Sequence, residues 1–320
     1  MSRYFLNAIA AALLAALVVG TGTAQAGVGR RWGDSYFTNL PVVDQDGKTL
    51  HFYDDLIKGK IVIISFIYTR CTDLCPLTTA RLAEAREKLG DAVGRDIFFI
   101  SLTVDPEHDT PVDLKRFADA YHPGPGWEFL TGRPEDIRAI DAKLGNTSVK
   151  LYEHRNQIVL GNDVTGEWQR DSPLGDINRL VMTIRALDPK WVEQERTPQQ
   201  TAASNTGYRM SAEPGQAMFT KLCAPCHTIG KGDRVGPDLK GVADRRDHDW
   251  LTSFMRFPKD MIASKDPIAV ALAEKYKGAL MPNLGVSAND ASDLIAYLKT
   301  ETARANSAQS VAERHDEPQK

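Results

Sequence analysis

Two patterns of apolar positions follow one another along the chain. In the first half, continuous apolar runs at residues 61–67 and 97–104 have the length of buried strands. Segments with apolar residues at helical spacing lie between and after these runs, at residues 76–88, 112–121, 134–144 and 177–187. Strands that alternate with helices predict a layered α/β domain. Residues 157–160 and 167–168 flank a turn rich in glycine, asparagine and aspartate, which predicts a hairpin.

The second half of the chain has helical patterns only. Residues 189–211 are rich in proline, glutamine, threonine and serine and poor in apolar residues, which indicates a linker. Helical segments follow at residues 214–222, 249–257 and 267–277. Ser287 and Asp290 form a capping-box pattern before a last helix. Residues 304–320 are polar, and we expect them to be disordered. The chain of 320 residues therefore predicts an α/β domain at 27–188 and an all-α domain at 212–303.

The first 26 residues have the layout of a secretory signal peptide. Arg3 provides a positive n-region, residues 8–19 are apolar, and Ala24-Gln25-Ala26 is a small-residue cleavage site. An uncleaved anchor helix is the alternative, although the apolar run is short for a membrane span. Either way we expect export to the periplasm, with membrane association only through this segment. The net charge of −3 argues against a nucleic-acid binder.

The four cysteines form two close pairs, and the second pair predicts a covalent haem. In Cys223-Ala224-Pro225-Cys226-His227, two thiols one helical turn apart suit the two haem vinyl groups, and the next histidine suits the iron. A disulfide beside an incidental histidine is the alternative. We expect Met281, which precedes a proline, to be the other axial ligand. Met255 and Met261 compete with it for this role.

The first pair, Cys71 and Cys75, lies between a predicted strand and a predicted helix. A helix N-terminus favours thiolate, so this pair suits disulfide exchange or the binding of a soft metal. A plain structural disulfide is a third interpretation. An added imidazole would suit copper in both oxidation states. The histidines of this region are His51, His108, His122 and His154.

Residues 212–303 resemble a monohaem class I cytochrome c domain. The resemblance rests on the haem-attachment motif, on Gly236-Pro237-Asp238-Leu239, and on Met281-Pro282 before the last helix. It implies that the Pro237 carbonyl accepts a hydrogen bond from the axial histidine, behind the metal ligands.

Residues 35–187 resemble the SCO/SenC family of copper-binding, thioredoxin-like proteins. Three segments carry the resemblance: residues 41–48, 67–76 and 101–111. The resemblance implies a thioredoxin-like fold and a copper site made by Cys71, Cys75 and His154. It also implies a role in assembling the dinuclear copper site of a respiratory cytochrome c oxidase, whose copper-site subunit, or another respiratory redox protein, would be the partner.

The sequence therefore predicts an exported redox protein with one copper and one haem c. Copper delivery and reduction of the target cysteines both remain open. A thiol–disulfide oxidoreductase coupled to haem c is the enzymatic alternative, with Cys71 and Cys75 as its redox-active thiols. A plain electron carrier, in which the N-terminal domain only docks partners, is the second alternative.

Overall fold

The computed structural model describes residues 32–33, 35–147, 157–191 and 213–315. The expected signal peptide and most of the expected linker lie outside the described residues. The described residues belong to one compact unit. No helix in this part of the chain has both the length and the apolar character that a membrane span needs.

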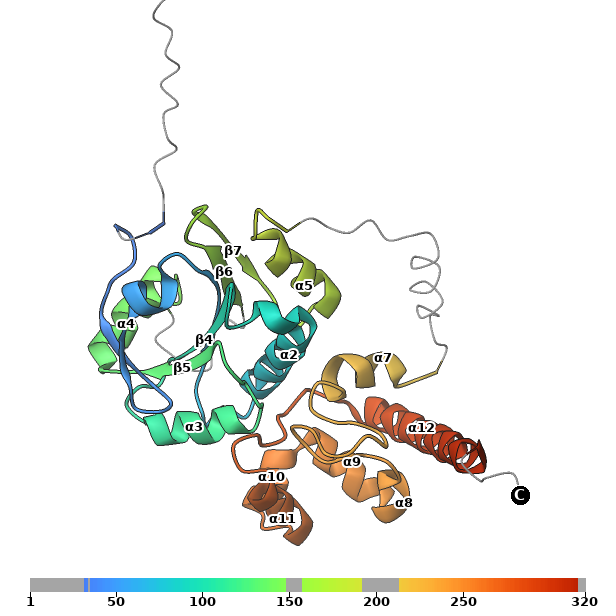
Figure 1. Cartoon of the computed structure of the whole chain (residues 1–320). Coiled ribbons are helices and arrows are strands. Elements are labelled where there is room, and N and C mark those ends of the chain that lie inside the picture. Colours follow the sequence, from blue (N-terminus) through green and yellow to red (C-terminus); the bar gives the residue numbers. More distant parts are fainter. Residues whose placement is uncertain (1–31, 34, 148–156, 192–212, 316–320) are drawn as a thin grey trace, which may run out of the picture. The chain divides into compact units, whose positions relative to one another are not determined.

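The N-terminal domain is built on a mixed sheet, in which the described strands follow the order β2-β1-β5-β4-β3-β6-β7 (Figure 1). Its strands are β1 (Pro41–Asp44), β2 (Thr49–His51), β3 (Ile61–Ile67), β4 (Ile97–Thr103), β5 (Trp127–Thr131), β6 (Ile158–Asn162) and β7 (Glu167–Asp171). The central strands β3, β4 and β5 are parallel, and the remaining pairings are antiparallel. The predicted strands and hairpin are confirmed.

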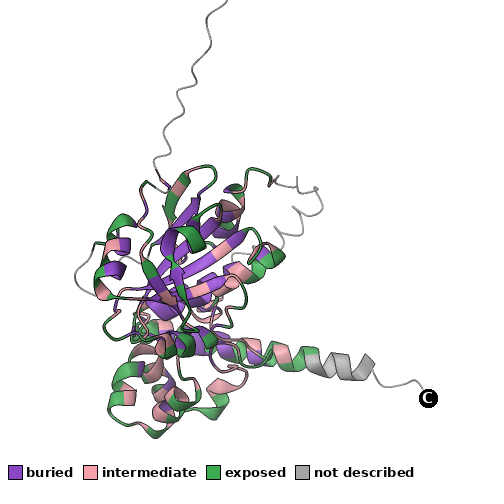
Figure 2. Ribbon diagram, turned by 60° about the vertical axis from the view of Figure 1, so that its left-hand side comes forward, coloured by how far each residue is buried: buried purple, intermediate pink, exposed green. Residues whose placement is uncertain are grey.

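Helices cover both faces of this sheet because its central strands are apolar on both sides. Ile61, Ile63 and Ile67 of β3 pack with α2 (Leu74–Leu89), α3 (Pro111–Asp119) and α5 (Ile177–Ala186). Val62 and Ile64 pack on the opposite face with the π-helical turn η1 (Phe52–Ile57) and α4 (Pro134–Lys143). A short 3-10 turn, η2 (Gly90–Ala92), follows α2. Burial is concentrated in these strands, as Figure 2 shows. The expected α/β thioredoxin-like class is confirmed.

Strand β5 is an element that the sequence pattern did not reveal. It is five residues long and follows the glycine- and proline-rich stretch 123–126. It is held by contacts distant in sequence, since the indole N–H of the fully buried Trp127 donates to Ser101 Oγ at 2.9 Å. Ser101 Oγ also lies 2.9 Å from Ser65 Oγ, so one polar chain links β3, β4 and β5.

The C-terminal domain is helical, as expected. It contains α7 (Gln216–Met218), the π-helical turn η4 (Phe219–Cys223), α8 (Val242–Arg245), α9 (His248–Arg256), α10 (Pro258–Ala263), α11 (Pro267–Lys275) and α12 (Ala288–His315). Its first and last helical segments meet closely. A Cβ at Gly215 would lie 2.4 Å from the Asp293 carbonyl oxygen, and the rings of Phe219 and Tyr297 are 5.4 Å apart. The Ser287–Asp290 capping box is present, with both of its hydrogen bonds.

The expectation of a disordered tail from residue 304 is wrong for residues 304–315, because α12 continues to His315. Arg304 forms ion pairs with Glu213 and Glu301, which tie this part of the helix to the start of the domain. The tail is also rich in alanine, the strongest helix former, so low apolar content alone was a poor guide.

Matched substitutions at Gly126 and Gly59 test the packing next to β5. A Cβ at Gly126 would lie 2.5 Å from both the amide nitrogen and the Cα of Gly94, and its φ is +82°. Gly59 has a similar φ of +73° with nothing within 4 Å of a Cβ. We expect Gly59→Ala to cost about 1–2 kcal/mol for the left-handed backbone alone. Gly126→Ala should cost about 1–3 kcal/mol more, from overpacking. If urea unfolding shows that the two variants lose the same free energy of unfolding, the contact between Gly126 and the Gly94 backbone is contradicted.

Candidate metal and haem sites

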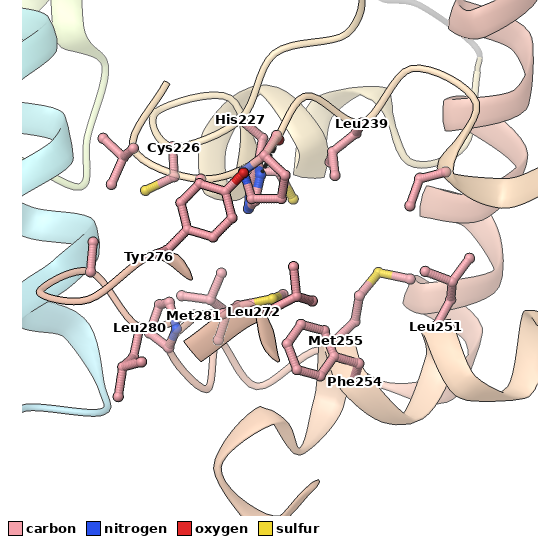
Figure 3. Close-up of a pocket in the computed structure, with 18 of the residues that line it drawn as sticks. Cys226, His227, Leu239, Leu251, Phe254, Met255, Leu272, Tyr276, Leu280 and Met281 are labelled. Atoms are coloured by element: carbon pink, nitrogen blue, oxygen red, sulfur yellow. Dashed lines mark hydrogen bonds between the residues drawn. The ribbon is translucent and has the colours of Figure 1, made fainter. Parts of the chain in front are cut away.

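An apolar cavity lies among the helices of the C-terminal domain (Figure 3). The labelled lining residues come from the cysteine motif, from the loop before α8, from α9 and α11, and from the loop before α12: Cys226, His227, Leu239, Leu251, Phe254, Met255, Leu272, Tyr276, Leu280 and Met281. Cys223 lines the same cavity. A mostly apolar cavity with two thiols, an imidazole and thioethers in its walls fits a haem.

His227 is held ready to bind a metal through one ring nitrogen. Its Nδ1 lies 2.8 Å from the Pro237 carbonyl oxygen, which fixes the proton on Nδ1 and leaves Nε2 as a ligand. This is the contact that the resemblance implied for Pro237. Burial lowers the pKa of His227, so the neutral form that ligates iron is favoured. A Cβ at Gly236 would lie 2.6 Å from the imidazole, so this position requires glycine.

The two thiols of the haem motif are partly buried, and the structure joins neither of them to another cysteine. Burial raises the pKa of both Cys223 and Cys226 to about 12.

Two of the three candidate methionines line the cavity. Figure 3 shows Met281 and Met255 on the side that faces His227. Met261 is not among the described lining residues. The structure therefore reduces the choice of axial ligand to Met281 and Met255.

The first cysteine pair lies where β3 leads into α2. The Cys71 N–H donates to the Tyr68 carbonyl oxygen at 3.1 Å, and Cys75 is in the first turn of α2. Both side chains are buried. A hydrogen bond from Cys75 lowers the pKa of Cys71 to about 7, with further donors in the backbone N–H groups of Asp73 and Cys75. The hydrogen bond to Cys71 and burial raise the pKa of Cys75. Near neutral pH, Cys71 is thus partly in its thiolate form, whereas Cys75 keeps its proton.

Two buried carboxylates hold the turn that carries Cys71. Asp109 accepts hydrogen bonds from the Thr69 hydroxyl at 2.6 Å, from the Thr69 N–H at 3.2 Å and from the Thr103 hydroxyl at 2.5 Å. Asp105 accepts from Arg70 at 2.6 Å. Our sequence reasoning assigned neither aspartate a role. The signal available was two acidic residues directly after a buried strand, where a carboxylate needs partners.

His154, which we expect to be the third copper ligand, falls within 148–156 and so lies outside the described residues. Of the other candidates, His108 Nδ1 contacts Asp105 at 2.7 Å. Among the described residues, no three His, Cys, Asp or Glu side chains form a group that could hold a metal ion. His51, His108 and His122 therefore do not complete a site with Cys71 and Cys75.

The pKa difference within the first pair makes a prediction for the reduced, haem-loaded chain, in which only Cys71 and Cys75 remain as thiols. Alkylation of Cys71 by iodoacetamide should reach half its maximal rate near pH 7, whereas an ordinary thiol titrates near 9.0. Because the pKa is lowered, the rate should fall as the pH drops below this value. Cys75→Ala removes the donor and should move the midpoint to higher pH. If mass spectrometry shows the same alkylation profile for Cys71 and Cys75, with a midpoint near pH 9, the lowered pKa of Cys71 is refuted.

The methionine ligand is tested by two matched substitutions. Met281→Ala should abolish the far-red sulfur-to-iron absorption band of the oxidised haem and lower its reduction potential, because methionine ligation raises that potential. Met255→Ala removes a thioether from the same cavity and should preserve the band. The reverse result assigns the iron to Met255.

Comparison with known proteins agrees with this division of the chain. Residues 35–160 match the family model SCO1/SenC, and residues 212–302 match the model for cytochrome c. The SCO1 protein homolog of Bacillus subtilis (strain 168) is 36% identical over 118 residues, which are 36% of this chain and 60% of that protein. The SCO2-like protein of Rickettsia felis (strain ATCC VR-1525 / URRWXCal2) is 32% identical over 106 residues, 33% of this chain and 49% of that protein. The chain thus matches between 49% and 60% of the length of these relatives.

Solved structures similar to this chain include SCO proteins. Arabidopsis thaliana ScoI with copper bound is 24% identical, with a TM-score of 0.39 over 47% of this chain and 95% of that one. BsSco, described as a member of the Sco family of cytochrome c oxidase assembly proteins, is 26% identical, with a TM-score of 0.39 over 49% of this chain and 96% of that one. From the two family matches, the chain carries an SCO1/SenC domain at residues 35–160 and a cytochrome c domain at residues 212–302.

Proposed function

We propose that this protein is an exported, periplasmic copper-binding redox protein that assists assembly of the copper site of a respiratory cytochrome c oxidase. The observation that carries the proposal is the buried Cys71–Cys75 pair at the start of α2, in which one thiol is poised as thiolate. The SCO1/SenC match, together with a similar protein of Stutzerimonas stutzeri that is described as copper-binding, supports copper as the metal bound by this pair. The oxidase as partner is supported by what similar SCO proteins are described to do.

The copper site in this proposal consists of Cys71, Cys75 and His154. Two thiolates select a soft ion such as Cu(I), and the added imidazole suits Cu(II) as well. Cys71 is already partly in its thiolate form near neutral pH, whereas Cys75 would release its proton on ligating the metal. The carboxylates of Asp105 and Asp109 hold the turn so that Cys71 stays next to Cys75.

The haem in this proposal is attached through Cys223 and Cys226. His227 and Met281 would be its axial ligands, and the Pro237 carbonyl orients the imidazole. When bound, the haem supplies one-electron redox capacity. The apolar walls keep water away from the iron site and favour a high reduction potential.

A thiol–disulfide oxidoreductase is the alternative, and the lowered pKa of Cys71 favours it specifically. In that function the Cys71 thiolate attacks a disulfide of a partner protein and forms a mixed disulfide. Cys75 then loses its proton and attacks Cys71. The products are the Cys71–Cys75 disulfide and two thiols on the partner, so the two electrons come from this pair.

Metal analysis separates the two functions. We expect the periplasmically expressed chain to contain about one iron and, after addition of Cu(I) to the reduced protein, about one copper. His154→Ala should lose the copper and keep the iron. His51→Ala, which changes an exposed histidine on β2, should keep both metals.

The opposite outcome would favour the function of a thiol–disulfide oxidoreductase. Iron alone, even after copper addition, together with reduction of a disulfide substrate that His154→Ala does not affect, would exclude the copper site.

A further inference from the structure

The wall of the haem cavity is not made by the cytochrome c domain alone. Pro76 and Tyr121 of the SCO1/SenC domain also line it. Pro76 directly follows Cys75 in α2, and Tyr121 follows α3. The side chain of Tyr121 is 2% exposed, and its hydroxyl has no hydrogen-bond partner among the described residues. A buried hydroxyl without a hydrogen-bond partner is unfavourable. Because the Tyr121 hydroxyl lies in the cavity wall, we infer that bound haem brings a polar atom next to it.

A second hollow lies on the other side of this wall. It is lined by Cys71 and its neighbours Thr69 and Arg70, by residues of α3, and by Gly278 and Leu280 of the cytochrome c domain. Pro76 and Leu280 line both hollows. Leu280 directly precedes the candidate ligand Met281. Single side chains therefore separate the surroundings of the thiol pair from the haem cavity.

Specific contacts fix this wall. The Asn283 N–H donates to the Thr72 carbonyl oxygen at 3.0 Å. This hydrogen bond joins the loop that contains Met281 to the loop between Cys71 and Cys75. Arg234, three residues before Pro237, forms an ion pair with Glu87 of α2 at 2.7 Å. The backbone also approaches α3 tightly at Gly278, where a Cβ would lie 2.4 Å from the Arg116 carbonyl oxygen.

We propose that the wall formed by Pro76, Tyr121 and Leu280 couples the two sites, so that the chemical state of the Cys71–Cys75 pair sets the reduction potential of the haem. This inference rests on the haem and thiol sites of the proposed function and adds regulation between them. A change of charge at the pair acts through an apolar wall, where electrostatic interactions are stronger than in water. The coupling is reciprocal, so haem oxidation state biases the state of the pair to the same degree.

The sign of the coupling follows from charge. The disulfide form of the pair is neutral, whereas two thiolates that hold one monovalent soft cation have a net charge of −1. A nearby negative charge stabilises oxidised haem relative to reduced haem, so it lowers the reduction potential. The haem of the disulfide form should therefore have the higher potential.

The experiment compares the haem-loaded full chain in two states by spectroelectrochemistry. The disulfide is made with diamide, which takes up the two electrons and two protons of the thiols. The metal form is made with Ag(I), a soft cation that keeps its oxidation state during the titration. We expect the equilibrium constant for haem reduction to be about fivefold or more higher in the disulfide form, which is ~40 mV for a one-electron couple. The same treatments of a Cys71→Ser, Cys75→Ser variant should give no difference.

Two glycines of one loop provide the matched variants. Gly278→Ala places a methyl group against the Arg116 carbonyl oxygen and should abolish the difference, because it displaces the loop from the SCO1/SenC domain. Gly285 also has a positive φ, of +68° against +99° at Gly278, but a Cβ there meets nothing within 4 Å. Gly285→Ala should therefore keep the difference.

Tyr121→Phe is the second variant and does not depend on the glycines. It should shift the haem potential in both states and leave the haem content unchanged. Tyr53→Phe, which removes a hydroxyl bonded to Asp163, should not shift it.

A haem potential that is equal in the disulfide and Ag(I) forms overturns the inference, even if the chain binds copper. A difference that survives Gly278→Ala also overturns it. A chain that fails to bind copper but shows the difference between the disulfide and Ag(I) forms removes the proposed copper site and leaves the coupling standing.

Discussion

The buried carboxylate of Asp109 is the contact on which the geometry of the Cys71–Cys75 pair depends. It lies after β4 and accepts three hydrogen bonds from Thr69 and Thr103, at the ends of the parallel neighbours β3 and β4. Burial raises the pKa of Asp109, and the hydroxyl donors act in the opposite direction. Burying a carboxylate without such donors would cost free energy. The turn that contains Thr69 must therefore keep its shape so that its donors stay on Asp109. That turn sets where Cys71 lies relative to the first turn of α2.

Helix α2 then connects this turn to the haem cavity. Its first turn contains Cys75 and Pro76, so the thiol and a residue of the cavity wall are neighbours on one rigid element. Glu87 near its C-terminal end pairs with Arg234 of the haem-binding segment. A partly exposed ion pair of this kind contributes about 0–1 kcal/mol. The close approach of Gly278 to Arg116 restricts the geometry of the contact, since it leaves no room for a side chain at position 278.

The sequence predicted those parts of the fold that depend on local pattern. The apolar run of β3 was located to the residue, and the capping box before α12 marked its start. Strand β5 was missed because its stability comes from the contact of Trp127 with Ser101 across the sheet. The helical tail was misjudged because composition cannot show that Arg304 has Glu213 as a partner. For the sites, motif spacing predicted roles for the cysteines and His227, and the structure places Cys223, Cys226 and His227 around one cavity.

Spacing could not show how differently the two cysteine pairs behave. Cys71 and Cys75 are buried, and Cys223 and Cys226 are partly buried. Burial raises the pKa of a thiol, as it does for Cys223 and Cys226. Cys71 differs because a neighbouring thiol and two backbone N–H groups donate to its sulfur and outweigh its burial. The donors exist because α2 begins at Leu74, between the two cysteines, and directs its free N–H groups toward Cys71. The pKa of the Cys71 thiol is thereby lowered, while the pKa values of Cys223 and Cys226 are raised. The difference between the two pairs thus comes from the Cys75 thiol and from the start of the helix that places it beside Cys71.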